Sequence, residues 1–221
     1  FRRVLFRSRA SACTEFPLGV GKLEAGEAAR KFADTVRPRM GAGDLPAILC
    51  GMVGSNLGWT QVPYLDSPVD LRGLHECMFE IPGSGPPVWI VPGVRCERPD
   101  GGPDVMRGEE TQVLGWMSLD RGRSKGEHLI CQPGTHTKWV RLHDGRLHSF
   151  VTSMTGELFD LLTRHSILKT DIFDQDLAAF DAGVAAAGDG NALASRLFTT
   201  RARVVDAASA RASVSTSSAG A

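Results

Sequence analysis

Apolar residues recur at helical spacing in two stretches of the first half of the chain. Ala28, Phe32 and Val36 lie four residues apart, a pattern that predicts a helix over 24–37. Within 108–117 the apolar residues again share one face, which predicts a second helix. Both stretches are therefore expected to pack one face against a core.

Two short apolar runs, 46–51 and 88–93, lie between these helices and end in glycine. Their length is typical of buried strands in a sheet that is covered on both faces. Strands that alternate with helices indicate an α/β fold.

After Gly126 the apolar positions alternate with a period of two. The pattern predicts strands at 129–132, 138–143 and 146–152. Asp-Gly at 144–145 separates the last two, and this dipeptide is among the strongest hairpin signals because both turn positions favour φ > 0. We expect an antiparallel three-stranded meander, followed by helices around 158–162 and 177–184.

Composition narrows the function classes. Lys and Arg number 25, as do Asp and Glu, so no overall basic charge favours nucleic acid or an anionic membrane as a partner. The uncharged stretch 45–65 contains several Gly and Pro residues, which disfavours a membrane-spanning helix. The five cysteines are widely spaced and form no C-x-x-C pair, which favours a reducing, cytoplasmic setting.

The two ends differ in composition from the remainder. Residues 1–15 are rich in Arg and precede the globular pattern, so they are interpreted as a leader outside the fold. Residues 207–221 are mostly Ala and Ser, a composition that predicts disorder. The expected organisation is a leader at 1–15, a partial first lobe at 16–124, a partial second lobe at 125–206 and a tail at 207–221.

One charged cluster, DVMRGEETQ at 104–112, opens the second predicted helix. Acidic residues stabilise helix N-termini, so capping explains the pattern as well as chemistry does. An Arg next to two carboxylates would also suit a general base with an anion clamp. The sequence leaves both interpretations open.

A second cluster, PGTHTK at 133–138, lies in the first turn of the meander. It is either a plain hairpin turn or a phosphate cradle, in which small residues let backbone N–H groups approach the ligand closely. By contrast, Gly19-Val-Gly21-Lys22 is followed by Leu23 and lacks the hydroxyl of a phosphate loop.

Five runs in order resemble the 2-dehydro-3-deoxygalactonokinase family of the actin and hexokinase superfamily: CGMVGSNLGWTQVPY (50–64), VPGV (91–94), DVMRGEETQ (104–112), PGTHTKWV (133–140) and MTGELFDLLTRHSIL (154–168). The resemblance covers roughly 16–205. It implies an α/β fold of two ribonuclease-H-like lobes with ATP and a sugar acid between them, both lobes being incomplete in this chain. It also implies Mg-ATP-dependent phosphorylation of the terminal hydroxyl of 2-dehydro-3-deoxy-D-galactonate.

The resemblance implies roles for individual residues. Glu109 follows Gly108 where related kinases carry the carboxylate that accepts the hydroxyl proton, so it is the expected general base, with Glu110 and Asp104 as alternatives. Ser55, Asn56 and Arg107 are expected at the sugar acid, with Arg107 facing its carboxylate. The residues that match the family's second phosphate hairpin are Gly134, Thr135, His136, Thr137 and Lys138.

The superfamily's first phosphate loop and its adenosine loop have no counterpart in the sequence. We therefore keep an alternative, a non-catalytic fragment that at most binds the sugar acid or a partner. A third interpretation, an ATP-dependent regulator of the same superfamily, is disfavoured by the uncharged, loop-rich segment 51–64, which suits a small polar ligand.

Overall fold

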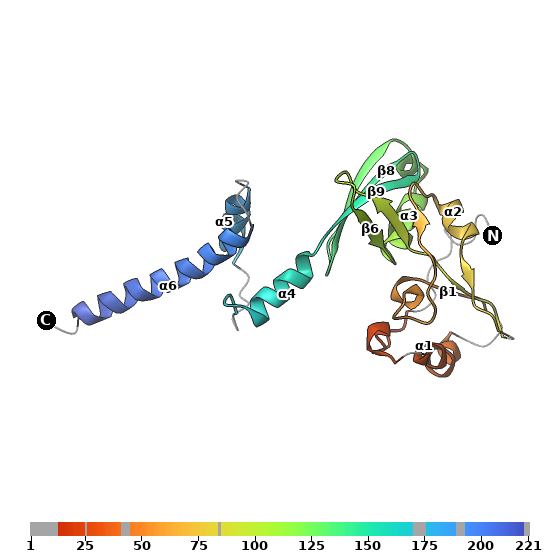
Figure 1. The fold of residues 1–221 in the computed structure, drawn as a ribbon, viewed down its shortest axis with the longest axis horizontal. Coiled ribbons are helices and arrows are strands. Elements are labelled where there is room, and N and C mark those ends of the chain that lie inside the picture. The colour runs from red at the N-terminus through yellow and green to blue at the C-terminus, as the bar shows by residue number, and fades with distance from the viewer. Residues whose placement is uncertain are drawn as a thin grey trace. The chain divides into compact units, whose positions relative to one another are not determined.

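The structure is a computed structural model of the 221-residue chain, and it describes residues 13–24, 26–40, 45–83, 85–169, 176–188 and 193–218, with side chains to 207. The chain divides into two compact units, Phe1–Ser153 and Met154–Ala221 (Figure 1). The lobe boundary predicted at 124–125 falls inside the first unit and stays a prediction. Residues 1–12 of the expected leader lie outside the described residues.

The first helical segment confirms the predicted stripe but has different ends. An α-helix, α1 (Glu27–Lys31), continues into a π-helix, η2 (Phe32–Val36), and a 3-10 turn, η3 (Arg37–Arg39). Phe32 is buried and packs with Ala47 and Val88. The segment passes through Pro38 because a 3-10 turn accepts proline in its first residues.

The first sheet has the order β1-β4-β3 and contains both predicted strands, β1 (Ala47–Leu49) and β4 (Val88–Ile90), in parallel. The third strand, β3 (Phe79–Glu80), pairs with β4 in antiparallel. The expectation that both faces are covered is wrong for β1: the helical segment packs on the Ala47 face, while Ile48 is 41% exposed.

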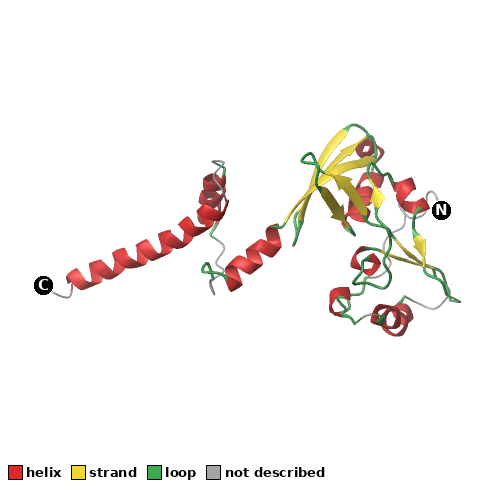
Figure 2. Cartoon of the chain, viewed as in Figure 1, coloured by secondary structure: helices red, strands yellow, loops and turns green. Residues whose placement is uncertain are grey.

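A second sheet, of order β2-β5-β6, was not predicted (Figure 2). It consists of β2 (Leu65–Asp66), β5 (Val94–Glu97) and β6 (Pro103–Met106). A short helix, α2 (Leu71–Glu76), follows β2 and is capped at its N-terminus by Asp70, whose side chain accepts a hydrogen bond from the Gly73 N–H. These strands have two to four residues, which is too short for a periodic signal.

The predicted meander is confirmed as β7 (Glu127–Gln132), β8 (Thr137–His143) and β9 (Arg146–Ser153), all antiparallel. Its second turn has φ of 44° at Asp144 and 79° at Gly145. The predicted helix at 108–117 is α3 (Glu109–Ser118).

One hydrophobic core joins α3, the second sheet and the meander. Val113 and Leu114 of α3 are 1% exposed and belong to the same cluster as Met106, Val140 and Phe150. Val69, two residues before α2, also forms an antiparallel backbone bridge with Leu147 of β9. The end of β6 and the start of α3 are thereby held rigidly next to the meander.

The second unit consists of α4 (Thr155–His165), α5 (Leu177–Ala187) and α6 (Leu193–Ser218), the first two in the predicted places. Helix α6 extends into the tail 207–221, for which the composition predicts disorder, and that expectation stays a prediction. Among the described residues no helix is long and apolar enough to cross a membrane. The mixed α/β class predicted from the sequence is confirmed.

Candidate functional site

The turn from β6 into α3 depends on Gly108. This residue has φ +113°, and a Cβ added there would lie 3.1 Å from the Gly51 Cα. A side chain would therefore meet both backbone strain and a close neighbour. Gly108 allows the helix to begin directly against the loop that follows β1.

Two adjacent carboxylates follow Gly108 in the first turn of α3, and their environments differ. Glu110 is fully buried, and both of its carboxylate oxygens accept the Gly108 N–H, at 2.8 and 2.7 Å. Burial raises the pKa of Glu110 because it penalises the charged form. Glu110 thus caps the helix from inside the core.

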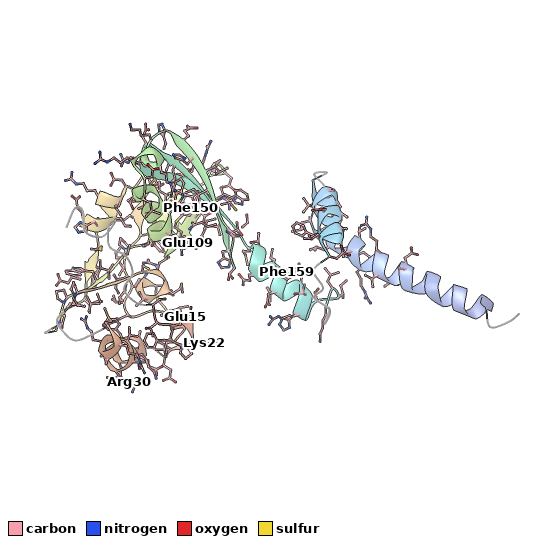
Figure 3. All side chains as sticks on the ribbon, turned by 180° about the vertical axis from the view of Figure 1, so that it is seen from behind. Glu15, Lys22, Arg30, Glu109, Phe150 and Phe159 are labelled. Atoms are coloured by element: carbon pink, nitrogen blue, oxygen red, sulfur yellow. The ribbon has the colours of Figure 1, made fainter. Side chains whose placement is uncertain are left out.

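Glu109, labelled in Figure 3, is half-buried. Its Oε2 accepts the backbone N–H of Arg107 at 3.1 Å. No residue that the structure describes donates to its Oε1. Both carboxylates accept backbone N–H groups ahead of the helix, but both oxygens of Glu110 are occupied, by the Gly108 N–H and the Thr111 hydroxyl, whereas Glu109 keeps one oxygen without a donor among the described residues.

Asp104, the third carboxylate of the cluster, is buried in a polar network. Its Oδ1 accepts the Val105 N–H at 2.8 Å and the Thr152 hydroxyl at 2.6 Å, and its Oδ2 accepts the Thr152 N–H at 2.7 Å. A general base must reach a substrate proton. These contacts favour a structural role for Asp104, which joins β6 to β9.

Lys138, expected at the phosphates, belongs to the same network. It is 5% exposed, and its Nζ donates to the Val105 carbonyl and to the Thr152 hydroxyl, each at 2.8 Å. The side chain points inward because it shares a strand face with Val140 and Leu142. The sequence pattern identified the hairpin, but the role expected for Lys138 at the phosphates took no account of this strand face.

The turn at 133–136 itself is more accessible. Thr135 is exposed, Thr137 is buried, and a Cβ on Gly134 would meet nothing closer than 3.9 Å. The Gln132 side chain donates to the Gln112 side chain at 3.0 Å. This bond connects the start of the turn, which also contains His136, to the helix that begins with Glu109.

A cavity of about 390 Å³ lies over residues 55–61, which we call the cleft segment. Ser55 and Asn56, the two residues expected at the sugar acid, line it together with residues from the N-terminal part of the unit: Gly21, Leu23 and Gly26. The Ser55 hydroxyl donates to the Met52 carbonyl at 2.8 Å and accepts the Leu57 N–H. Ser55 thus fixes the turn, while Asn56 is exposed.

Three further residues of the cleft segment were not singled out from the sequence: Trp59, Thr60 and Gln61. The Trp59 ring packs against Phe32, with ring centroids 5.4 Å apart. An aromatic wall beside polar side chains is typical of small-molecule sites. The signal available in the sequence was the Trp among uncharged polar residues.

Arg107 does not line this cavity but contacts the cleft segment at its neck. Its Nη2 donates to the Val62 carbonyl at 2.7 Å, and its guanidinium lies over the Tyr64 ring, 4.3 Å from the centroid. Its Nε and Nη1 are buried and have no hydrogen-bond partner among the described residues. The backbone N–H of Arg107 also donates to the Glu109 carboxylate, so Arg107 connects the neck of the cleft segment to the candidate base.

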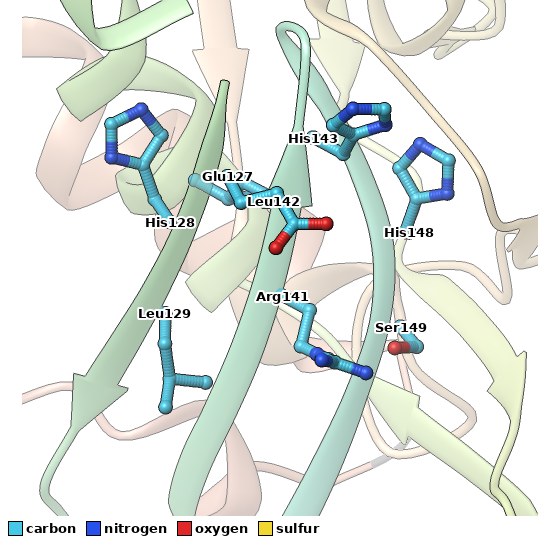
Figure 4. Close-up of a pocket in the computed structure, with 8 residues that line it drawn as sticks. All are labelled: Glu127, His128, Leu129, Arg141, Leu142, His143, His148 and Ser149. Carbon is cyan, nitrogen blue, oxygen red and sulfur yellow. The ribbon is translucent and has the colours of Figure 1, made fainter. Parts of the chain in front are cut away.

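A larger cavity, of about 660 Å³, lies on the meander and contains none of the predicted site residues (Figure 4). His143 and His148 face each other there, with ring centroids 5.5 Å apart. Within the described parts of the chain, no three His, Cys, Asp or Glu side chains are grouped to hold a metal ion. Mg²⁺ commonly binds through one or two carboxylates plus substrate phosphates, which needs no such group.

The comparisons with known proteins agree on one family. The family model described as 2-keto-3-deoxy-galactonokinase matches residues 2–221, a wider range than the 16–205 indicated by the motifs. A Rhizobium meliloti (strain 1021) protein named "Probable 2-dehydro-3-deoxygalactonokinase" is 43% identical over 164 residues, which are 72% of this chain and 52% of that protein. The Escherichia coli (strain K12) 2-dehydro-3-deoxygalactonokinase is 38% identical over 159 residues, covering 71% and 51%.

A crystal structure of a Sinorhizobium meliloti protein assigned the same name superposes with a TM-score of 0.69 at 39% identity. The match covers 78% of this chain and 58% of that one. The chain thus spans about half the length of the curated relatives it matches.

Proposed function

Because the chain belongs to the 2-keto-3-deoxy-galactonokinase family, we propose that it acts in the ATP-dependent phosphorylation of the terminal hydroxyl of 2-dehydro-3-deoxy-D-galactonate. The observation that supports this most is the accessible oxygen of Glu109 at the start of α3, joined through Arg107 to the cleft segment. A base and a small-molecule cleft are thereby parts of one connected structure.

The sugar acid is proposed to occupy the cleft over residues 55–61. Ser55 shapes its floor, Asn56 offers an exposed amide, and Trp59 supplies an apolar wall. Arg107 lies behind the segment and does not line the cavity, and its positive charge favours an anionic ligand such as a carboxylate there.

Glu109 is proposed to accept the proton of the attacking hydroxyl. Phosphoryl transfer depends mostly on positioning and on electrostatic stabilisation, so the base needs one free oxygen and a fixed orientation. Its bond from the Arg107 N–H supplies the orientation. Bound Mg-ATP supplies the phosphoryl group, and the turn with Gly134, Thr135 and His136 is proposed to hold the phosphates through backbone N–H groups and the Thr135 hydroxyl.

Two measurements on the purified chain test the proposal. Titration with 2-dehydro-3-deoxygalactonate is expected to change the fluorescence of Trp59, with Trp59→Phe as the control that removes the signal. Added Mg-ATP is expected to release ADP only when the acid is present. Absence of both signals would contradict the proposal, and binding without ADP release would support the alternative of a non-catalytic sugar-acid-binding chain.

Thr135 and Lys138 are expected to respond differently to substitution. Thr135→Val removes an exposed hydroxyl and should raise the KM for ATP about tenfold without changing the Tm, since the lost donor contacts only ligand. Lys138→Met should instead lower the Tm, because it breaks a buried polar network. Steady-state kinetics and thermal melting of both variants make the comparison. An unchanged KM for ATP in Thr135→Val would show that the turn is a plain hairpin and not a phosphate site.

A further inference from the structure

Tyr64 and Arg107 form a stack that nothing in the proposed reaction yet uses. The guanidinium carbon lies 4.3 Å from the centroid of the Tyr64 ring. A cation at this distance from an aromatic face is attracted by the ring quadrupole, and the attraction grows when both groups are shielded from water. Arg107 is half-buried, and its Nε and Nη1 are shielded.

The surrounding backbone leaves room for this stack and little else. A Cβ on Gly93 would lie 2.6 Å from the Tyr64 Cε1, so the ring rests directly on the glycine backbone. On the other side, a Cβ on Gly54 would lie 2.9 Å from the Arg107 Nη1. The guanidinium therefore occupies a slot between the Tyr64 ring and the chain at Gly54.

The same guanidinium binds one of the two residues that flank the cleft segment, and that residue is hydrogen-bonded to the other. Its Nη2 binds the Val62 carbonyl at 2.7 Å, and the Val62 N–H binds the Gly54 carbonyl at 3.0 Å. Gly54 and Val62 thus close the neck of the loop that carries Ser55 and Trp59. The backbone N–H of the same residue donates to the Glu109 carboxylate.

We propose that Tyr64 is a positioning residue, whose ring holds the Arg107 guanidinium at the neck of the cleft segment and so sets the affinity for the sugar acid. The inference rests on the proposed function for its ligand. Tyr64 itself touches neither the cavity lining nor Glu109 in the contacts that the structure describes. It acts through Arg107.

The first measurement is the dissociation constant of 2-dehydro-3-deoxygalactonate, determined by calorimetry on the full chain. Tyr64→Leu is expected to raise it about tenfold, whereas Tyr64→Phe, which keeps the ring, should restore it to within about twofold. In an Arg107→Met background, Tyr64→Leu should cause no further change, since the cation that the ring holds is gone. Equal dissociation constants for Tyr64→Leu and Tyr64→Phe would overturn the proposal. So would a Tyr64→Leu effect on the dissociation constant that is as large in the Arg107→Met background as in the unsubstituted chain.

The second measurement needs no ligand and separates this proposal from the proposed function. Hydrogen exchange of the Trp59 and Val62 amides is expected to be at least tenfold faster in Tyr64→Leu and in Arg107→Lys, which lacks the planar group. Leu74→Ala, a core substitution in α2 away from the stack, should lower the Tm without selectively exposing these two amides. If the unsubstituted chain fails to bind the acid, the proposed function is refuted. Faster exchange confined to the Trp59 and Val62 amides would still show that Tyr64 positions Arg107. Exchange that rises uniformly through the unit, or not at all, in Tyr64→Leu would refute the positioning role.

Discussion

Glu109→Gln is expected to lower kcat by about 100-fold or more while leaving the KM for ATP nearly unchanged, because general-base catalysis typically contributes a factor of about 10² to 10⁴. Gln is isosteric with Glu, and its carbonyl oxygen can still accept the Arg107 N–H. The fold at the start of α3 is therefore kept, and the variant loses only the ability to take a proton. The measurement is ADP release with saturating Mg-ATP and the sugar acid, relative to the unsubstituted protein.

Substitutions at two other carboxylates provide the comparison. Glu76→Gln changes an exposed carboxylate in α2 that pairs with Arg72 and does not line the cavity over the cleft segment, and it should leave kcat unaltered. Asp104→Asn should reduce stability more than turnover at low temperature, since its contacts are all with the fold. Near-normal turnover in Glu109→Gln together with an inactive Asp104→Asn would identify Asp104 as the general base.

The elements that the sequence predicts well are those whose periodic signal is long. The meander has strands of six to eight residues and a turn that needs Asp-Gly, so both its strand positions and its turn could be derived. Helix α3 was equally clear because Val113, Leu114 and Met117 share a buried face. The second sheet, with strands of two to four residues, has no periodic pattern to read.

The roles of the predicted site residues stay predictions, and their geometry could not be derived from the sequence. Ser55 and Asn56 do line a cavity, and Glu109 does keep an accessible oxygen. The expected role of Lys138 at the phosphates took no account of the strand face: Lys138 alternates with Trp139 and shares the inward face of Val140 and Leu142. The stack of Arg107 on Tyr64 could not be predicted either, since it joins positions 43 residues apart in the sequence, next to β2 and β6 of the second sheet, whose short strands carry no periodic signal.

Asp104→Ala is expected to destabilise the first unit by about 3–5 kcal/mol, the usual cost of removing one partner from a buried charged network. The loss has three parts that the structure identifies. The Thr152 N–H and the Val105 N–H lose their acceptor. The Thr152 hydroxyl, which donates to Asp104 and accepts from the Lys138 ammonium, loses the acceptor that orients it. The Lys138 ammonium, 5% exposed, then keeps its burial without the nearby carboxylate.

Urea unfolding followed by tryptophan fluorescence measures this loss, because all four Trp residues lie within Phe1–Ser153 and the signal therefore reports that unit. Asp66→Ala is the matched control: Asp66 pairs with Arg95 on the surface, so its removal should shift the midpoint far less. Adding Lys138→Met to Asp104→Ala should recover part of the stability, since the buried charge is then gone. A midpoint for Asp104→Ala equal to that of Asp66→Ala would show that the network does not hold β6 to the meander, and Asp104 would again be a candidate for the chemistry.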